Sequence, residues 1–298
     1  MNKGNIKLSL VSFVFAATVL GNNMQVGASG YVKSLSGGVN TLSASVSKNV
    51  TNLSAEELTS KKVSLQSGGA YGINIKDLYL SNSPSVELKI SPLTSSKATP
   101  YFIVKSNKSL FNALQMQVDS KNKKISIKMK NKNKQYKVSE FVIEVYAPVK
   151  AISCEGEYNV DVTSSSISSF SLQSEGKIIG TLNISASNSI NIGSEGEVNL
   201  KLNGSTDKLK CQLEGESELK LSGSASKLTY QLEGEGTLNA ASFKTHDCKL
   251  NLEGEGTVSV YVDKSFKASA EGEWVCSYAG NPKNVAIDRE GECVFKKL

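Results

Sequence analysis

Apolar and polar residues alternate strictly along the second half of the chain, and the apolar residues fall on one parity. Residues 209–213 (LKCQL) and 228–232 (LTYQL) are typical runs. A period of two is that of a β-strand, in which successive side chains point to opposite faces. The pattern therefore predicts strands with one buried and one solvent-exposed face.

The alternation is organised around a Glu-Gly-Glu tripeptide, or a close variant, that recurs at almost constant spacing. Successive glycines lie 20, 20, 19, 19, 20, 18 and 19 residues apart. Such a period is typical of proteins in which one short unit stacks on the next. Because the glycine has inward parity, we expect it at a bend that excludes a β-carbon or needs a positive φ. The predicted structural glycine ladder is Gly156, Gly176, Gly196, Gly215, Gly234, Gly254, Gly272 and Gly291.

The period of two excludes helical repeats, and no helix-forming segment follows each strand as a leucine-rich repeat would require. The fold class predicted is therefore all-β, a parallel β-helix with coils of about 19–20 residues stacked about 4.8 Å apart. Polar segments between the strand pairs should form its turns. These segments are residues 203–207, 222–226, 245–247 and 280–282.

Two repeats carry a resemblance to a known family. Residues 200–206 (LKLNGST) lead to 213–216 (LEGE), and residues 219–225 (LKLSGSA) lead to 232–236 (LEGEG). Together with residues 141–152 and 278–282, this pattern resembles the bacterial auto-transporter adhesin head domain, or head GIN domain, over roughly residues 63–295. The resemblance implies a right-handed β-helix and an adhesive role. This chain has Glu-Gly-Glu where the family usually has Ser-Gly-Ser.

The N-terminus predicts export. Lys3 and Lys7 precede or lie within an apolar run over residues 6–20, and Ala28 ends a small-residue cleavage signal. We expect a secretory signal peptide at residues 1–28, cleaved after Ala28, and a secreted or cell-envelope protein with no transmembrane span once mature. A polar, flexible tether should follow at 29–62. The β-helix domain should cover 63–298, with irregular coils at 63–150 and regular repeats at 151–298.

Charge is divided unequally between the two halves. Residues 29–150 hold 18 lysines and 7 acids, a net +11, whereas residues 151–298 hold 14 basic and 21 acidic residues, a net −7. The basic half could contact an anionic wall polymer or acidic glycan, or its lysines could form a solvated strand face. Specific nucleic-acid binding is not expected, because Arg289 is the only arginine. The candidate polyanion contacts are Lys121, Lys123, Lys124, Lys128, Lys130, Lys132 and Lys134.

Stacking would place the glutamates on either side of each glycine in two columns of carboxylates. Like charges about 5 Å apart repel by about 1 kcal/mol even in water. Flanking lysines or bound divalent cations should offset this repulsion, so weak Ca²⁺ binding is one interpretation and a solvated face is the other. The hypothetical metal ligands are Glu214, Glu216, Glu233, Glu235, Glu253 and Glu255.

The remaining chemistry points away from redox, metal or catalytic centres. All five cysteines have inward parity, which predicts buried core residues without disulfides. His246 is the only histidine and has outward parity beside a predicted turn. Polysaccharide lyases on β-helices cluster Asp, Lys and Arg in one cleft, whereas the carboxylates here repeat uniformly.

We therefore expect an exported, non-catalytic surface or envelope module that binds a cell-surface glycan or polymer. The alternative is a structural or Ca²⁺-binding spacer, and a lyase-like enzyme ranks last. Apart from weakly bound Ca²⁺, no cofactor is expected. The sequence carries no signal for an oligomeric state.

Overall fold

The computed structural model describes residues 16–20, 23–27, 57–78, 80–81, 85–95, 97–132 and 134–298. The chain divides into two compact units, residues 1–53 and 54–298. In the first unit, β1 (Ala16–Leu20) pairs antiparallel with β2 (Asn23–Gly27). The other residues of the predicted signal peptide, and the predicted tether up to residue 56, lie outside the described residues.

The second unit begins with short strands and one short helix. They are β3 (Leu58–Ser64), β4 (Tyr71–Ile75), β5 (Leu80–Ser81), β6 (Val86–Ser91), β7 (Tyr101–Asn107), α1 (Lys108–Ala113), β8 (Leu114–Asp119), β9 (Lys124–Met129), β10 (Tyr136–Lys137) and β11 (Phe141–Tyr146). Alternate side chains of β4, β6 and β9 are buried, as the period of two predicts. β3 begins at Leu58, inside the segment that we expected to be a tether. Among the described residues, no helix is long and apolar enough to cross a membrane.

Apart from β5 and β10, which pair in parallel as a separate two-stranded sheet, these strands join β12 (Val149–Ala279) in one open sheet of mixed strand direction. The order is β3-β7-β11-β6-β12-β4-β9-β8, and β13 (Asn284–Lys297) also pairs with β12. β7 runs antiparallel to both β3 and β11, and β8 runs antiparallel to β9. The other pairs are parallel. An all-β fold is confirmed, but the predicted fold class, a right-handed parallel β-helix, is wrong. The 20-residue pattern is confined to the second half of the domain, and we extended it to strands that pair differently.

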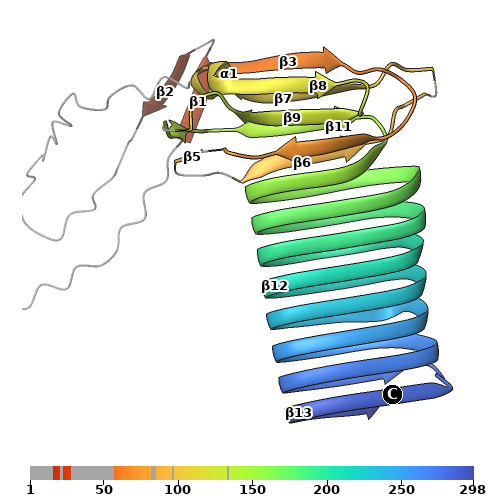
Figure 1. The fold of residues 1–298 in the computed structure, drawn as a ribbon. Coiled ribbons are helices and arrows are strands. Elements are labelled where there is room, and N and C mark those ends of the chain that lie inside the picture. Colours follow the sequence, from red (N-terminus) through yellow and green to blue (C-terminus); the bar gives the residue numbers. More distant parts are fainter. Residues whose placement is uncertain are drawn as a thin grey trace, which may run out of the picture. The chain divides into compact units, whose positions relative to one another are not determined.

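The regular part of the sequence forms β12, a single continuous strand that winds through stacked turns (Figure 1). Three of the four predicted turn segments, residues 203–207, 222–226 and 245–247, lie within this strand. Only the segment at 280–282 interrupts it, between β12 and β13. Polar residues therefore marked the outward side of a bent strand here, not a break in it.

The predicted glycine ladder lies along one corner of these turns. In β13, Gly291 pairs with Gly272 of the turn before it. Gly176 has φ +106°, and a β-carbon there would lie 2.6 Å from the carbonyl oxygen of Gly156. That distance is too short for any side chain. Each glycine thus allows the backbone of one turn to lie directly on the next.

The inward side chains of the turns form one core with those of the N-terminal strands, except in β13, where Val285 and Ile287 are exposed. Small and large residues alternate along it. Trp274 is fully buried, and its ring fills the space that Gly256 leaves. Tyr230 is also fully buried, with its hydroxyl 3.0 Å from that of Ser217. This packing holds the outward columns at fixed positions.

Candidate functional site

The outward columns are positioned by the parity that the sequence predicts. Leu213 is 3% exposed and Leu232 is 3% exposed. The glutamates that follow them, Glu214 and Glu233, are exposed. The register assigned to the regular repeat is therefore confirmed, and each residue at a given offset from the glycine belongs to one column on the surface.

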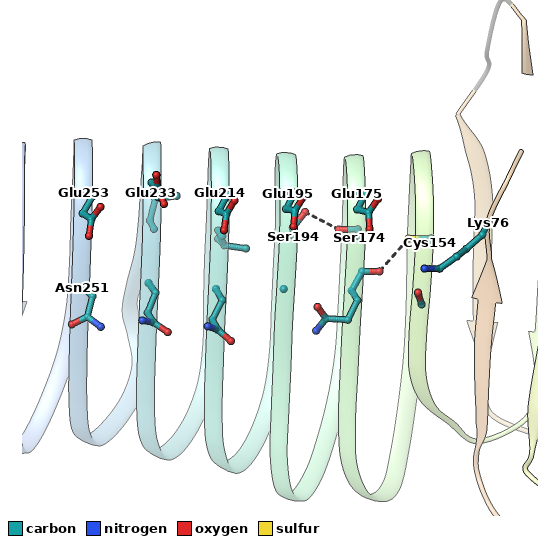
Figure 2. A pocket seen from close by; sticks show the side chains of 17 residues that line it. Lys76, Cys154, Ser174, Glu175, Ser194, Glu195, Glu214, Glu233, Asn251 and Glu253 are labelled. Carbon is teal, nitrogen blue, oxygen red and sulfur yellow. Dashed lines mark hydrogen bonds between the residues drawn. The ribbon is translucent and has the colours of Figure 1, made fainter. Parts of the chain in front are cut away.

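A groove with a volume of about 600 Å³ runs along one side of the glycine corner (Figure 2). Carboxylates form one wall and amides the other. The carboxylates, one residue before each glycine, are Glu175, Glu195, Glu214, Glu233 and Glu253. The amides, three residues before the glycine, are Gln173, Gln212, Gln231 and Asn251. Neighbouring turns thus repeat the same pair of polar groups.

The groove is long and has one notch. From Ser153 to Asn251 it crosses five spacings of about 4.8 Å, or about 24 Å in all. Gly193 takes the place of an amide in the third of these turns, and the side chain of Gln173 lies over it. Lys76, the residue after β4, closes the N-terminal end of the groove. The shape suits an extended ligand of several units.

The floor of the groove is rigid and its polar atoms are paired. Beneath the walls, the hydroxyls of Ser174 and Ser194 lie 2.7 Å apart in a buried hydrogen bond. The thiol of Cys154 faces the carbonyl oxygen of Gln173 at 3.9 Å. Burial raises the pKa of that thiol to about 12, so it stays protonated and unreactive at neutral pH. The floor therefore supports the walls, and its thiol supplies no nucleophile.

A second, shallower groove of about 490 Å³ follows the other side of the corner. It is lined mainly by the glutamates one residue after each glycine, including Glu216, Glu235 and Glu255. At its N-terminal end, Lys177 pairs with Glu197 at 2.7 Å. Apart from this pair, its walls carry carboxylates with few amides or hydroxyls to complement them.

The six glutamates predicted as metal ligands all lie exposed in these two columns. None of the six takes part in an ion pair of the described part of the chain. Among the described residues, no group of three or more His, Cys, Asp or Glu side chains has a geometry that could hold a metal ion. The structure thus forms the columns but gathers no coordination shell.

The structure gives most of the lysines predicted as a polyanion contact separate roles, and only Lys123 and Lys124 line one pocket. The ammonium of Lys123 donates to the carbonyl oxygens of Gln66 and Ser67, and that of Lys130 donates to the carbonyl oxygen of Asn112. Lys132 pairs with Asp77 at 2.8 Å, and Lys134 lies 5.0 Å above the ring centre of Tyr136. Lys121, Lys124 and Lys128 are exposed. Several of these lysines therefore hold loops and strand ends together.

The cysteines and the histidine are placed as parity predicts. All five cysteines are buried and free, so the prediction of core thiols without disulfides is confirmed. Burial raises the pKa of Cys211 and Cys276 to about 12. His246 is exposed, and its Nδ1 lies 3.2 Å from a carboxylate oxygen of Asp263.

Two parts of the groove escaped the sequence analysis. The amide column could have been found, because its members share one offset from the repeated glycine. Lys76 could not, because its approach to the first turn depends on the parallel pairing of β4 with residues 149–154 of β12. No periodic signal connects those segments.

Comparisons with known proteins agree with this description. A crystal structure of a putative adhesin from Parabacteroides merdae is similar, with a TM-score of 0.66 at 15% identity over 81% of this chain and 96% of that chain. A putative adhesin from Parabacteroides distasonis gives a TM-score of 0.65 at 17% identity, over 81% and 97% of the two chains. A putative lipid binding protein from the same species gives 0.60 at 16% identity, over 81% and 96%.

These likenesses concern the fold. No curated protein is significantly similar to the chain in sequence. The family model described as "Putative auto-transporter adhesin, head GIN domain" matches residues 86–282, well over half of the chain. The resemblance seen in the repeats is thereby confirmed, and the chain belongs to the family of head GIN domains of putative auto-transporter adhesins.

Proposed function

We propose that this protein is an exported, non-catalytic adhesin module that binds a neutral glycan chain along the groove of amides and carboxylates. Export would use the signal peptide predicted at residues 1–28. The supporting observation is that an amide and a carboxylate line the groove together on successive turns, Gln212 with Glu214 and Gln231 with Glu233. A polymer of sugars offers similar hydroxyls at regular intervals, and the groove offers similar partners at regular intervals.

The chemistry of the two walls suits hydroxyl groups. An amide side chain both donates and accepts hydrogen bonds, as a hydroxyl does. A carboxylate accepts strongly from a hydroxyl, because a charged acceptor shortens and strengthens the bond. A run of both groups can therefore satisfy donors and acceptors on a sugar ring at once.

The charge of the groove narrows the ligand class further. Five carboxylates line it, and the cations near it are few. A polyanion laid along this wall would be repelled at every turn. The proposed ligand is therefore not the anionic wall polymer but a chain that is neutral over most of its length.

Two other functions fit the groove less well. Catalysis by paired carboxyls needs two groups in contrasting environments, whereas these glutamates are exposed and repeat one environment. One solved structure of the same fold is described as a putative lipid binding protein. Lipid tails need an apolar cavity, but this groove is walled by amides and carboxylates.

The test is a glycan and cell-wall polysaccharide array probed with the purified exported protein and with a double variant, Gln212→Ala with Gln231→Ala. We expect the exported protein to bind neutral oligosaccharides, and the variant to bind about tenfold more weakly, because each lost hydrogen bond contributes about 0.5–1.5 kcal/mol. Asn239→Ala is the matched control, since Asn239 is exposed on the same turns but lies outside the groove.

The outcomes separate the alternatives. Shortening of an arrayed polysaccharide would contradict the proposal that the module is not catalytic. Equal binding by the double variant and the control would place the ligand elsewhere on the surface. If no binding to any neutral glycan is detected, the proposal is overturned in favour of a structural spacer.

A further inference from the structure

We propose that a lysine-lined pocket at the N-terminal end of the groove binds the acidic sugar that ends, or interrupts, the neutral chain. This inference rests on the proposed function, since it assigns one end of the same ligand. The group that the pocket would recognise is a carboxylate or a sulfate on a sugar. It also gives the bound chain a direction along the turns.

The pocket is made where three strands from distant parts of the sequence lie side by side. β4 pairs in parallel with β9 on one side and with the first turn of β12 on the other. In this register Gly72 lies between Lys124 and Ala151, and Asn74 lies between Ser126 and Ser153. Gly72 has no side chain, which leaves a hollow of about 340 Å³ between the flanking strands.

The charged side chains among the residues that line this pocket are all cationic. Its four charged residues are all lysines, Lys76, Lys123, Lys124 and Lys150, and no carboxylate lines it. Among the described residues, Lys76 and Lys150 take part in no ion pair. Lys123 has two carbonyl oxygens as partners and keeps its charge without a counterion.

Asp119, an acid on the strand beside Lys124, is engaged elsewhere. It lies opposite Lys124 on the paired strand β8. Its carboxylate accepts hydrogen bonds from the backbone and side chain of Asn122 and from the backbone of Lys121, which lower its pKa. Asp119 is not part of the pocket lining. The excess of positive charge therefore remains available to a ligand.

A second observation points to a sugar and not to a bare anion. The side-chain oxygen of Asn74 is buried and has no hydrogen-bond partner. Asn74 also lines the pocket. A buried acceptor without a partner is unfavourable, and rotation of the Asn74 side chain toward the pocket would let a ligand hydroxyl satisfy it. A sugar with an acidic group supplies both the hydroxyl for Asn74 and the anion for the lysines.

The pocket and the groove are continuous. Lys76 and Ser153 line both. Figure 2 shows Lys76 reaching from its strand toward the first turn, at the end of the row of glutamates. One face thus changes from lysines to carboxylates along its length. A chain bound there would place its anionic sugar at the lysines and its neutral sugars between the amides and carboxylates.

The test uses small probes whose binding does not depend on the groove. Isothermal titration of the exported protein with D-glucuronate, methyl glucoside and sulfate should show binding of the two anions and much weaker binding of the neutral sugar. The double variant Lys76→Ala with Lys150→Ala should weaken glucuronate about tenfold, which corresponds to about 1.4 kcal/mol. The control is Lys201→Ala with Lys220→Ala, which removes two exposed lysines of later turns.

The variant Asn74→Ala distinguishes recognition of a sugar from recognition of an anion alone. It should weaken glucuronate and leave sulfate unchanged, because sulfate has no hydroxyl to donate at neutral pH. Equal glucuronate binding by the lysine variant and its control would overturn the inference. So would equal affinity for glucuronate and methyl glucoside. If neutral oligosaccharides still bind the lysine variant, the proposed function stands even when the inference fails.

Discussion

The stacked turns of β12 and the strands before it both bury an apolar face, but their strands pair in different ways. Each turn of β12 lies on another turn with the same offsets, so Glu271, Gly272 and Glu273 pair with Glu290, Gly291 and Glu292. The earlier strands pair with partners of unrelated sequence and in both directions, as β11 does, antiparallel to β7 and parallel to β6. A local repeat can specify its own register. The register of the strands before β12 instead depends on contacts between segments that are far apart in the sequence.

The two regions also differ in what they present to solvent. The turns repeat one polar pair over a long face, which suits a periodic ligand. The earlier strands bring together lysines from the end of β4, the start of β9 and the start of β12 at a single place. A repeated region thus extends a surface, and an irregular region ends it with a distinct feature.

The largest expected effect breaks the register of the turns. Leu232→Asp would bury an unpaired carboxylate at a position that is 3% exposed. We expect a loss of several kcal/mol in the free energy of unfolding, measured by urea titration. Asn239→Asp, at an exposed position, should change it little. Wild-type stability in Leu232→Asp would show that the assigned parity is wrong.

The thiols offer a comparably large contrast between the folded and unfolded chain. Burial raises the pKa of Cys154 and Cys211 to about 12, compared with about 8.5 for a free thiol. Native protein at pH 8 should therefore react with a disulfide reagent at least about a thousandfold more slowly than protein in urea. Mass spectrometry of the labelled peptides checks each site, and rapid native labelling of Cys211 would contradict its place in the core.

The same shifts predict a dependence of stability on alkaline pH. The folded state favours the neutral thiols, so their contribution is fully present below the unfolded pKa of about 8.5 and is lost as pH rises toward about 12. Urea titrations at pH 8 and at pH 10.5 should show lower stability at the higher pH. Stability that rises over this interval would contradict the assignment.

A smaller effect compares glycines of the two regions. Gly176→Ala combines a positive φ with a β-carbon 2.6 Å from a backbone oxygen, and should cost about 3 kcal/mol or more. Gly68→Ala is the matched control. Its φ is +82°, but nothing lies within 4 Å of the added carbon, so only about 1 kcal/mol of backbone strain is expected. Equal melting temperatures for the two variants would exclude close stacking at the corner.

The smallest effect concerns the carboxylate columns. Replacing Glu214, Glu216, Glu233 and Glu235 together by Gln removes repulsion between exposed charges, and should stabilise the protein by up to about 1 kcal/mol in calcium-free buffer. Differential scanning calorimetry with and without millimolar Ca²⁺ tests the cation hypothesis in the same experiment. A Ca²⁺-dependent rise in the melting temperature of the wild type, absent from the variant, would support weak cation binding. Destabilisation by the four substitutions would refute the repulsion argument.

The regular half of the domain was readable because its information is local. Parity alone placed Leu213 in the core and Glu214 on the surface, and the constant spacing placed Gly291 against Gly272. The repeat also contained the amide column, although we did not recognise it. Its polar segments were misread as turns, because outward residues of a continuous bent strand have the same composition as a loop.

The sequence by itself determined an all-β chain, the face of each repeated strand, the burial of its cysteines and its family. Only the tertiary structure decided the mixed sheet, the continuous strand through the predicted turns and the meeting of Lys76, Lys124 and Lys150 around Asn74. The physical reason is that periodicity records which side of a strand is buried. It does not record which distant strand lies beside it, because that choice depends on closing long loops and packing the whole core.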